Sequence, residues 1–144
     1  MFKCALAILV VVACVPDSRG QRFRIDPREK AEQYTPERLA QSWYGWYLRR
    51  NANGDEWGPV AKALRSERAP IDVLADLLGG KEYYDYAGGT LPGFVLQLMN
   101  DVGHVNPSGR ELSDVLRNLP GEDRRAIAFS FLDRYRDNWV PGRR

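Results

Sequence analysis

The chain carries a stripe of apolar side chains at the spacing of an α-helix. Leu39, Trp43 and Tyr47 follow one another every four residues, which places them on one helix face. Residues 35–37, Thr-Pro-Glu, precede the stripe and combine a capping hydroxyl, a proline suited to the first turn and an acid that favours the helix dipole. The pattern predicts a helix from residue 35 to about residue 50.

The same pattern occurs a second time along the chain. Residues 35–64 match residues 90–119 without a gap, and a match at fixed spacing indicates one structural unit used twice. We therefore expect unit one at 35–80 and unit two at 90–140. Identical residues stand at the paired positions Thr35/Thr90, Asn51/Asn106, Gly54/Gly109, Glu56/Glu111, Val60/Val115 and Leu64/Leu119.

Each unit is predicted to hold three helices. In unit one, a second helix begins at Asp55 or Glu56 and ends near Leu64, and a third runs from about Pro70 to Leu78 before the glycines 79–80. In unit two, the first helix starts at residue 90, and the second ends before Pro120-Gly121. The last is expected to be long, because Ile127, Phe131, Tyr135 and Trp139 keep their spacing until Pro141.

The segment between the units, residues 82–89, is rich in tyrosine and is predicted to form a short helix and a turn. No part of the chain after the N-terminal run needs to be a strand. The predicted fold class is all-α: two tandem three-helix units packed into one small helical domain and preceded by a cleaved signal peptide.

The N-terminal residues have the layout of an export signal. Lys3 precedes an apolar run, Cys4–Val15, which is shorter than the roughly 20 residues that a membrane span needs. We expect residues 1–20 to be a signal peptide cleaved after Gly20, residues 21–34 to be a flexible charged leader, and residues 141–144 to be a basic tail. Two alternatives stay open: a lipoprotein anchored through Cys14, or an uncleaved apolar helix.

Composition narrows the functional classes. Both cysteines lie in the predicted signal peptide, so the mature chain is expected to have no disulfide, no cysteine nucleophile and no thiolate metal site. The formal net charge is only +2, and the basic clusters lie near the ends of the mature chain, at 22–30 and 143–144. We expect no nucleic-acid partner.

Few residues are candidates for chemistry. His104 is the only histidine, so neither a multi-histidine metal site nor a usual serine triad is expected, and a loop histidine is favoured over a general base. Residues 51–62 resemble a calcium loop only weakly, because Glu56 and Lys62 replace its required glycine and glutamate. Glu56 and Glu111 form a candidate carboxylate pair, but each also lies where an acid favours a helix start.

Aromatic side chains give the better indication of a binding surface. We expect the candidate interaction surface in the first helix and at the junction of the units. The alternative interpretation is that the aromatic rings of these segments pack into the core. Its residues are Tyr44, Trp46, Tyr83, Tyr84 and Tyr86.

Several short segments together resemble a bacterial family, a repeat-containing domain of unknown function found in many secreted and cell-surface proteins. The resemblance covers roughly residues 40–135 and implies a helical, exported domain with no established catalytic residue. His104 departs from it, since an arginine is common there, and Asp114-Val115 stand where a Tyr-Trp pair is usual. A fainter similarity to the linker domains of phycobilisomes implies a protein-joining role. The segments are 80–84, 88–95, 101–103, 107–108 and 111–112.

These observations favour a non-enzymatic protein-interaction or scaffold domain, exported to the periplasm, the cell surface or the medium of a bacterium. The expected partner is an unidentified protein of the cell envelope or extracellular space, with no cofactor and no metal. A membrane is expected as a partner only if Cys14 is lipidated. The alternative is a carbohydrate or small-ligand binding module in a groove between the units, with Trp46 or Tyr84 as a stacking platform. A carboxylate-dependent hydrolase using Glu56 and Glu111 is the second alternative.

Overall fold

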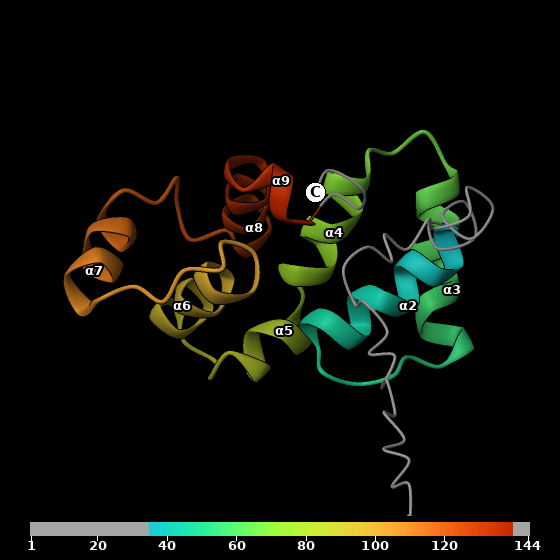
Figure 1. Cartoon of the computed structure of the whole chain (residues 1–144), viewed down its shortest axis with the longest axis horizontal. Coiled ribbons are helices and arrows are strands. Elements are labelled where there is room, and N and C mark those ends of the chain that lie inside the picture. The colour runs from blue at the N-terminus through green and yellow to red at the C-terminus, as the bar shows by residue number, and fades with distance from the viewer. Residues whose placement is uncertain (1–34, 140–144) are drawn as a thin grey trace, which may run out of the picture.

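The computed structural model describes residues 35–139, and over this range the chain folds into α-helices with no β-strand (Figure 1). The predicted all-α fold is therefore confirmed. None of the described helices is long and apolar enough to cross a bilayer. The predicted signal peptide, leader and basic tail lie outside the described residues. The helices are α2 (Pro36–Tyr47), α3 (Gly54–Arg65), α4 (Pro70–Leu78), α5 (Lys81–Tyr86), α6 (Leu91–Asp101), α7 (Gly109–Arg117), α8 (Arg124–Arg134) and α9 (Arg136–Trp139).

Matching sequence positions begin matching helices in the same way. The Thr35 hydroxyl accepts the backbone N–H of Arg38 at the start of α2, and the Thr90 hydroxyl accepts that of Gly93 at the start of α6. Each hydroxyl thus satisfies a donor that the first helical turn leaves unpaired.

The starts of α3 and α7 share a second device, the capping box. The side chain of Asn53 accepts the backbone N–H of Glu56, whose carboxylate accepts the N–H of Asn53 in return. Ser108 and Glu111 make the same reciprocal pair of bonds at α7. Both glutamates therefore serve as helix-start acids.

The two halves of the molecule meet along α4 and α8. In Figure 1, α2 and α3 lie side by side at one end, α7 lies at the other end, and α4 and α8 lie between them. A Cβ added at Gly79, which follows α4, would stand 2.7 Å from the Cα of Arg125 on α8. The backbones can approach this closely because residue 79 has no side chain.

One apolar cluster spans both halves and forms the core. Tyr83 of the short helix α5 belongs to this core, whereas α7 contributes no fully buried residue. Within residues 35–139, the indole nitrogen of Trp43 is the one buried side-chain polar atom without a hydrogen-bond partner. The largest fully buried side chains are Trp43, Tyr83, Phe94, Leu74, Leu78, Leu98, Ile127, Leu132, Val95 and Val102.

The last helix differs from the prediction of one continuous helix to Pro141. It breaks at Tyr135, whose φ and ψ of −109° and 37° are not helical, and the short helix α9 follows. After the break, the indole N–H of Trp139 donates to the carbonyl of Leu132 at 2.6 Å. The break therefore allows the Trp139 indole N–H to reach a hydrogen-bond acceptor while the ring is buried. The i+4 spacing by itself does not indicate this bond.

Candidate functional site

The structure separates the five candidate aromatic residues by exposure. Tyr44 and Tyr83 are buried, Tyr84 is partly buried, and Trp46 and Tyr86 are about half exposed, at 50% and 48%. Trp46 directly precedes the buried Tyr47 on α2. Because successive residues of a helix are turned by about 100°, its side chain points away from the buried stripe. Tyr44 and Tyr83 thus belong to the core rather than to an accessible surface.

The two buried tyrosines are held by polar contacts. The hydroxyl of Tyr44 donates to the backbone carbonyl of Glu56 at 3.2 Å, and the guanidinium of Arg50 lies 5.3 Å from its ring centre. The hydroxyl of Tyr83 donates to Asp101 at 3.1 Å. Burial raises the pKa of both hydroxyls, and the charge of Asp101 raises the pKa of Tyr83 further.

Tyr84 faces a separate, shallow hollow. The guanidinium of Arg124 lies 4.7 Å from the centre of its ring, and the ring also packs against Phe94. Leu91 and Glu122 complete the hollow. Since Arg124 covers one side of this ring and Phe94 packs against it, Tyr84 offers less free aromatic surface than Trp46.

Trp46 instead borders a pocket of about 350 Å³ where the end of α2 meets the end of α6 and α9. We call it the junction pocket. The exposed indole of Trp46 forms part of its wall, and the buried rings of Tyr47 and Trp139 also line it. Its residues are Trp46, Tyr47, Arg49, Asn100, Asp101, His104, Asn138 and Trp139.

Asp101 organises the polar side of the junction pocket. Its carboxylate accepts hydrogen bonds from the guanidinium of Arg49 at 2.8 Å, the hydroxyl of Tyr83 at 3.1 Å and the amide of Gln97 at 2.9 Å. Its side chain is only 4% exposed, whereas that of Arg49 is 55% exposed. The carboxylate therefore fixes the arginine at the pocket while remaining covered.

Arg49 connects the junction pocket to the second exposed aromatic residue. Hydrogen bonding with the Tyr86 side chain and the nearby charge of Asp101 raise the pKa of the Arg49 guanidinium. Val105, which follows His104, is also exposed. Trp46, Tyr86 and Val105 are the exposed large apolar residues of the described chain, and all three lie at or next to this pocket's lining residues.

Backbone strain occurs at the same place. Arg49 and His104 have positive φ angles of 55° and 53° and are the non-glycine residues with positive φ within 35–139. Both line the junction pocket. Strained residues of this kind gather at functional sites, where the side chain is needed despite its unfavourable backbone. Trp46 was a predicted surface residue, whereas no sequence pattern connects it to Arg49, Asn100 or Asp101.

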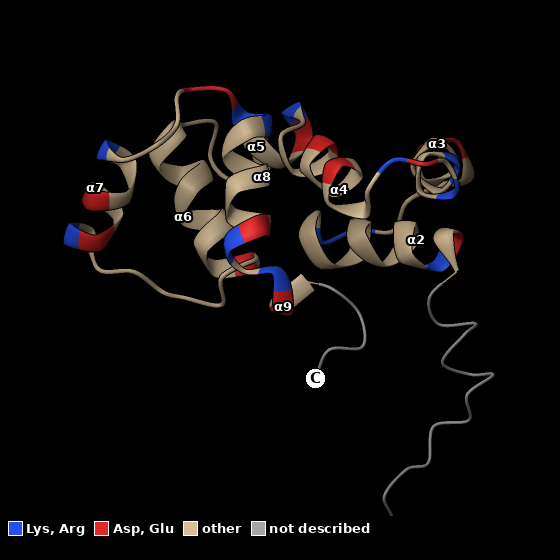
Figure 2. Cartoon of the chain, turned by 90° about the horizontal axis from the view of Figure 1, so that it is seen from above, with Lys and Arg blue, Asp and Glu red and all other residues tan. Residues whose placement is uncertain are grey.

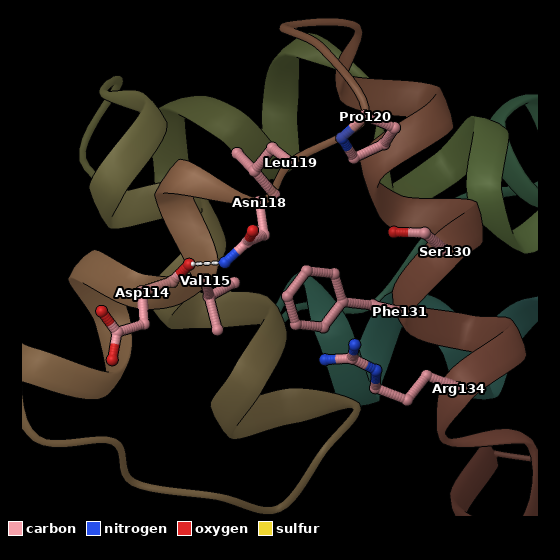
Figure 3. Close-up of a pocket in the computed structure, with 8 residues that line it drawn as sticks. All are labelled: Asp114, Val115, Asn118, Leu119, Pro120, Ser130, Phe131 and Arg134. Atoms are coloured by element: carbon pink, nitrogen blue, oxygen red, sulfur yellow. Dashed lines mark hydrogen bonds between the residues drawn. The ribbon is translucent and has the colours of Figure 1, made fainter.

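A larger hollow of about 380 Å³ lies between α7 and α8 (Figure 3). Phe131 and Arg134 of α8 face Val115 of α7 and Asn118, which follows α7, across it. The amide of Asn118 is already engaged by the backbone carbonyl of Asp114 at 2.7 Å. This hollow has neither an exposed aromatic ring nor a strained residue, so it is the weaker candidate.

The candidate carboxylate pair is not brought together. Glu56 lies in the first turn of α3 and Glu111 in the first turn of α7, and these helices lie at opposite ends of the molecule (Figure 1). Hydrogen bonds from Arg50 and from the backbone of Asn53 lower the pKa of Glu56 to about 2, and bonds from Ser108 lower that of Glu111. Both are held as ionised capping groups, and neither faces the other across a cleft.

Acidic and basic residues are interspersed over the surface (Figure 2). Residues of both signs occur on α3, α7 and α8, whereas α4 carries acidic residues only and α6 carries almost no charge. Within residues 35–139, no group of three or more His, Cys, Asp or Glu side chains is placed to hold a metal ion. The junction pocket is thus an aromatic and polar site in a surface without a single-sign field.

Comparison of the chain with protein-family models, with curated proteins and with solved structures finds no match in any of the three. The family resemblance drawn from the sequence therefore stays a prediction. The chemistry of the junction pocket has to be inferred from its own geometry.

Proposed function

We propose that the protein is a non-enzymatic binding domain and that it holds a small polar ligand in the junction pocket, against Trp46. The observation that carries this proposal is the concentration of unusual features at one place. The exposed large apolar residues and the strained residues Arg49 and His104 all lie at or beside this pocket. Exposed tryptophan side chains are enriched at binding surfaces, where the apolar ring contacts the ligand and the N–H stays accessible.

The size and lining of the junction pocket suit such a ligand. Its volume of about 350 Å³ lies within the range of roughly 300–1,000 Å³ that is usual for small-molecule sites. Such sites combine apolar walls with a few polar groups that orient the ligand. Here Trp46 and Trp139 supply aromatic walls, while Asn100 and Arg49 supply polar groups.

Binding is favoured over catalysis by the state of the acidic groups. Asp101 is the one carboxylate that lines the junction pocket, and both of its oxygens already accept hydrogen bonds. It is therefore occupied as a structural acceptor. Glu56 and Glu111 are too far apart in the fold to flank one scissile bond, so we do not propose the hydrolase alternative.

Protein interaction is the second candidate, and the exposure of Trp46 and Tyr86 favours it. Aromatic side chains of this kind are common at the centres of protein interfaces. A protein partner would have to be met in the cell envelope or outside the cell if the predicted export occurs. The small number of exposed apolar residues between 35 and 139 supports a compact ligand pocket more than a broad interface.

The proposal can be tested by nuclear magnetic resonance on the isotope-labelled full chain. A panel of small polar compounds, comprising sugars, amino acids, nucleosides and carboxylates, is added singly. We expect at least one compound to shift the indole N–H signal of Trp46, while that of Trp57 on α3 stays in place as the internal control. Trp46→Ala should abolish the shifts of the remaining junction-pocket signals. A panel in which no compound moves any of these signals would contradict the proposal.

A further inference from the structure

The indole of Trp46 gives the junction pocket a flat apolar surface that is accessible to a ligand. It is 50% exposed and is carried by α2, whose neighbouring residue Tyr47 is anchored in the core. Sugar rings present a face of C–H groups, with their hydroxyls around the rim. Such a face packs on an aromatic ring without covering the hydroxyls, because the ring is large, apolar and electron-rich on its face.

The charges of the junction pocket cancel. Arg49 and Asp101 are the charged residues of its lining, and they form an ion pair at 2.8 Å. A phosphate or carboxylate ligand would compete with Asp101 for Arg49, and a cation would meet a carboxylate with both oxygens engaged. The local charge balance therefore favours an uncharged ligand.

Two polar side chains in the lining have no partner of their own. Within residues 35–139, the amide of Asn100 and the imidazole of His104 make no side-chain hydrogen bond. An amide offers two N–H donors and an oxygen acceptor, and an imidazole offers two ring nitrogens for hydrogen bonds. A hydroxyl also donates and accepts, so both groups can bind ligand hydroxyls that present either function.

The remaining polar groups are held in place before a ligand arrives. Asp101 fixes Arg49, and the amide of Asn138 donates to the backbone carbonyls of Val102 and Gly103 at 3.0 and 3.4 Å. The left-handed backbone at Arg49 and His104 further defines where their side chains begin. A preorganised site loses little conformational entropy on binding.

From these observations we infer that the ligand of the junction pocket is a neutral carbohydrate, a mono- or disaccharide unit that stacks on Trp46 and is read by Asn100 and His104. This inference rests on the proposed binding function and adds the class of ligand. A lipid chain is disfavoured, because the polar side chains of Asn100, His104 and Asn138 line the junction pocket beside its ion pair.

The test is a titration of the full chain with defined probes, in which binding is measured by isothermal titration calorimetry and by the resonance of the Trp46 indole N–H. The neutral probes are cellobiose, maltose, lactose and N,N′-diacetylchitobiose. The matched probes are digalacturonic acid for negative charge and adenosine for stacking without a sugar chain. We expect at least one neutral disaccharide to bind, with an affinity that changes less than about twofold between low and high salt, since no net charge is involved.

Variants separate a role in binding from a role in folding. Trp46→Ala should weaken the affinity for the sugar at least about tenfold, as expected for a central aromatic contact, whereas Trp46→Phe should retain much of the affinity. Asn100→Ala should weaken it as well. Gln41→Ala, an exposed change on the same helix, should leave the affinity unchanged. Unaltered circular dichroism and melting of Trp46→Ala would show that the loss is local.

The outcomes distinguish the two proposals. If other small compounds shift the Trp46 signal but no neutral sugar does, or only adenosine or digalacturonic acid binds, the carbohydrate inference is overturned while the binding function stands. If no probe and no compound of the wider panel shifts this signal, both are overturned. Sugar binding that survives Trp46→Ala also overturns the inference, since the ligand would then lie elsewhere.

Discussion

Arg49 and His104 adopt the same left-handed backbone conformation, with φ angles of 55° and 53°, just after the ends of α2 and α6. Helices commonly end with a left-handed residue, and that residue is usually glycine because a Cβ is unfavourable there. The chain places an arginine and a histidine at these two positions instead. Both side chains line the junction pocket, which gives a functional reason to tolerate the strain.

His104→Gly should therefore stabilise the fold while impairing the site. Removing the side chain from a left-handed residue is expected to raise the free energy of unfolding by about 1 kcal/mol. The same change removes a polar group of the junction pocket and should weaken ligand binding. Denaturant unfolding measures the first effect. His104→Asn is the control, since asparagine tolerates this backbone and keeps a polar side chain. A loss of stability in His104→Gly would show that the imidazole packs favourably.

Asp101→Asn should destabilise the fold more than Arg49→Ala, which removes the charged partner of Asp101. The carboxylate is 4% exposed and accepts bonds from three side chains, and an amide, with one oxygen and two donors, cannot replace it. Leaving the buried hydroxyl of Tyr83 unsatisfied should lower the free energy of unfolding by about 2 kcal/mol. Arg49→Ala should lower it by less than about 1 kcal/mol, because this partner is largely exposed. Equal losses in urea unfolding would contradict this ranking.

The sequence predicted those features of the fold that depend on neighbouring residues. Thr35 and Thr90 cap helices because the hydroxyl and the N–H that it accepts lie three residues apart. Apolar stripes likewise predicted the buried helix faces, because residues three or four positions apart lie on the same face of a helix. The break at Tyr135 was missed because the i+4 spacing continues through it to Trp139, whose indole bond to Leu132 forms only in the folded chain.

The candidate site was predicted less completely, for a different physical reason. Tyr44 and Trp46 are two residues apart on α2, and only the position of α3 determines that Tyr44 is the buried one. The partners of Asp101 come from the end of α2, from α5 and from α6. No local pattern connects such separate segments, so the junction pocket could not be assembled from spacing alone.

Gly79→Ala should weaken the contact between α4 and α8. A Cβ at this residue would lie 2.7 Å from the Cα and 2.9 Å from the backbone nitrogen of Arg125, and backbone atoms cannot move aside as a flexible side chain can. We expect a loss of about 2 kcal/mol in the free energy of unfolding, as for other overpacked sites. Gly45→Ala is the matched control on α2, where a Cβ meets no atom within 4 Å. It should stabilise that helix by up to about 1 kcal/mol. Similar effects of the two changes would contradict the close approach of the backbones.

Glu56→Gln should make stability less dependent on pH in the acid range. Hydrogen bonds from Arg50 and from the backbone of Asn53 lower the pKa of Glu56 from 4.5 to about 2 in the folded chain. A carboxyl group with a lowered folded pKa stabilises the fold above its unfolded pKa, and this contribution is lost as the pH falls from about 4.5 towards about 2. Unfolding in urea at a series of pH values should show a smaller loss of stability across this window for Glu56→Gln than for the unchanged chain. Arg50→Ala should reproduce only part of the effect, because the bond from Asn53 remains. Parallel stability curves for Glu56→Gln and the unchanged chain would show that the ion pair does not form in solution.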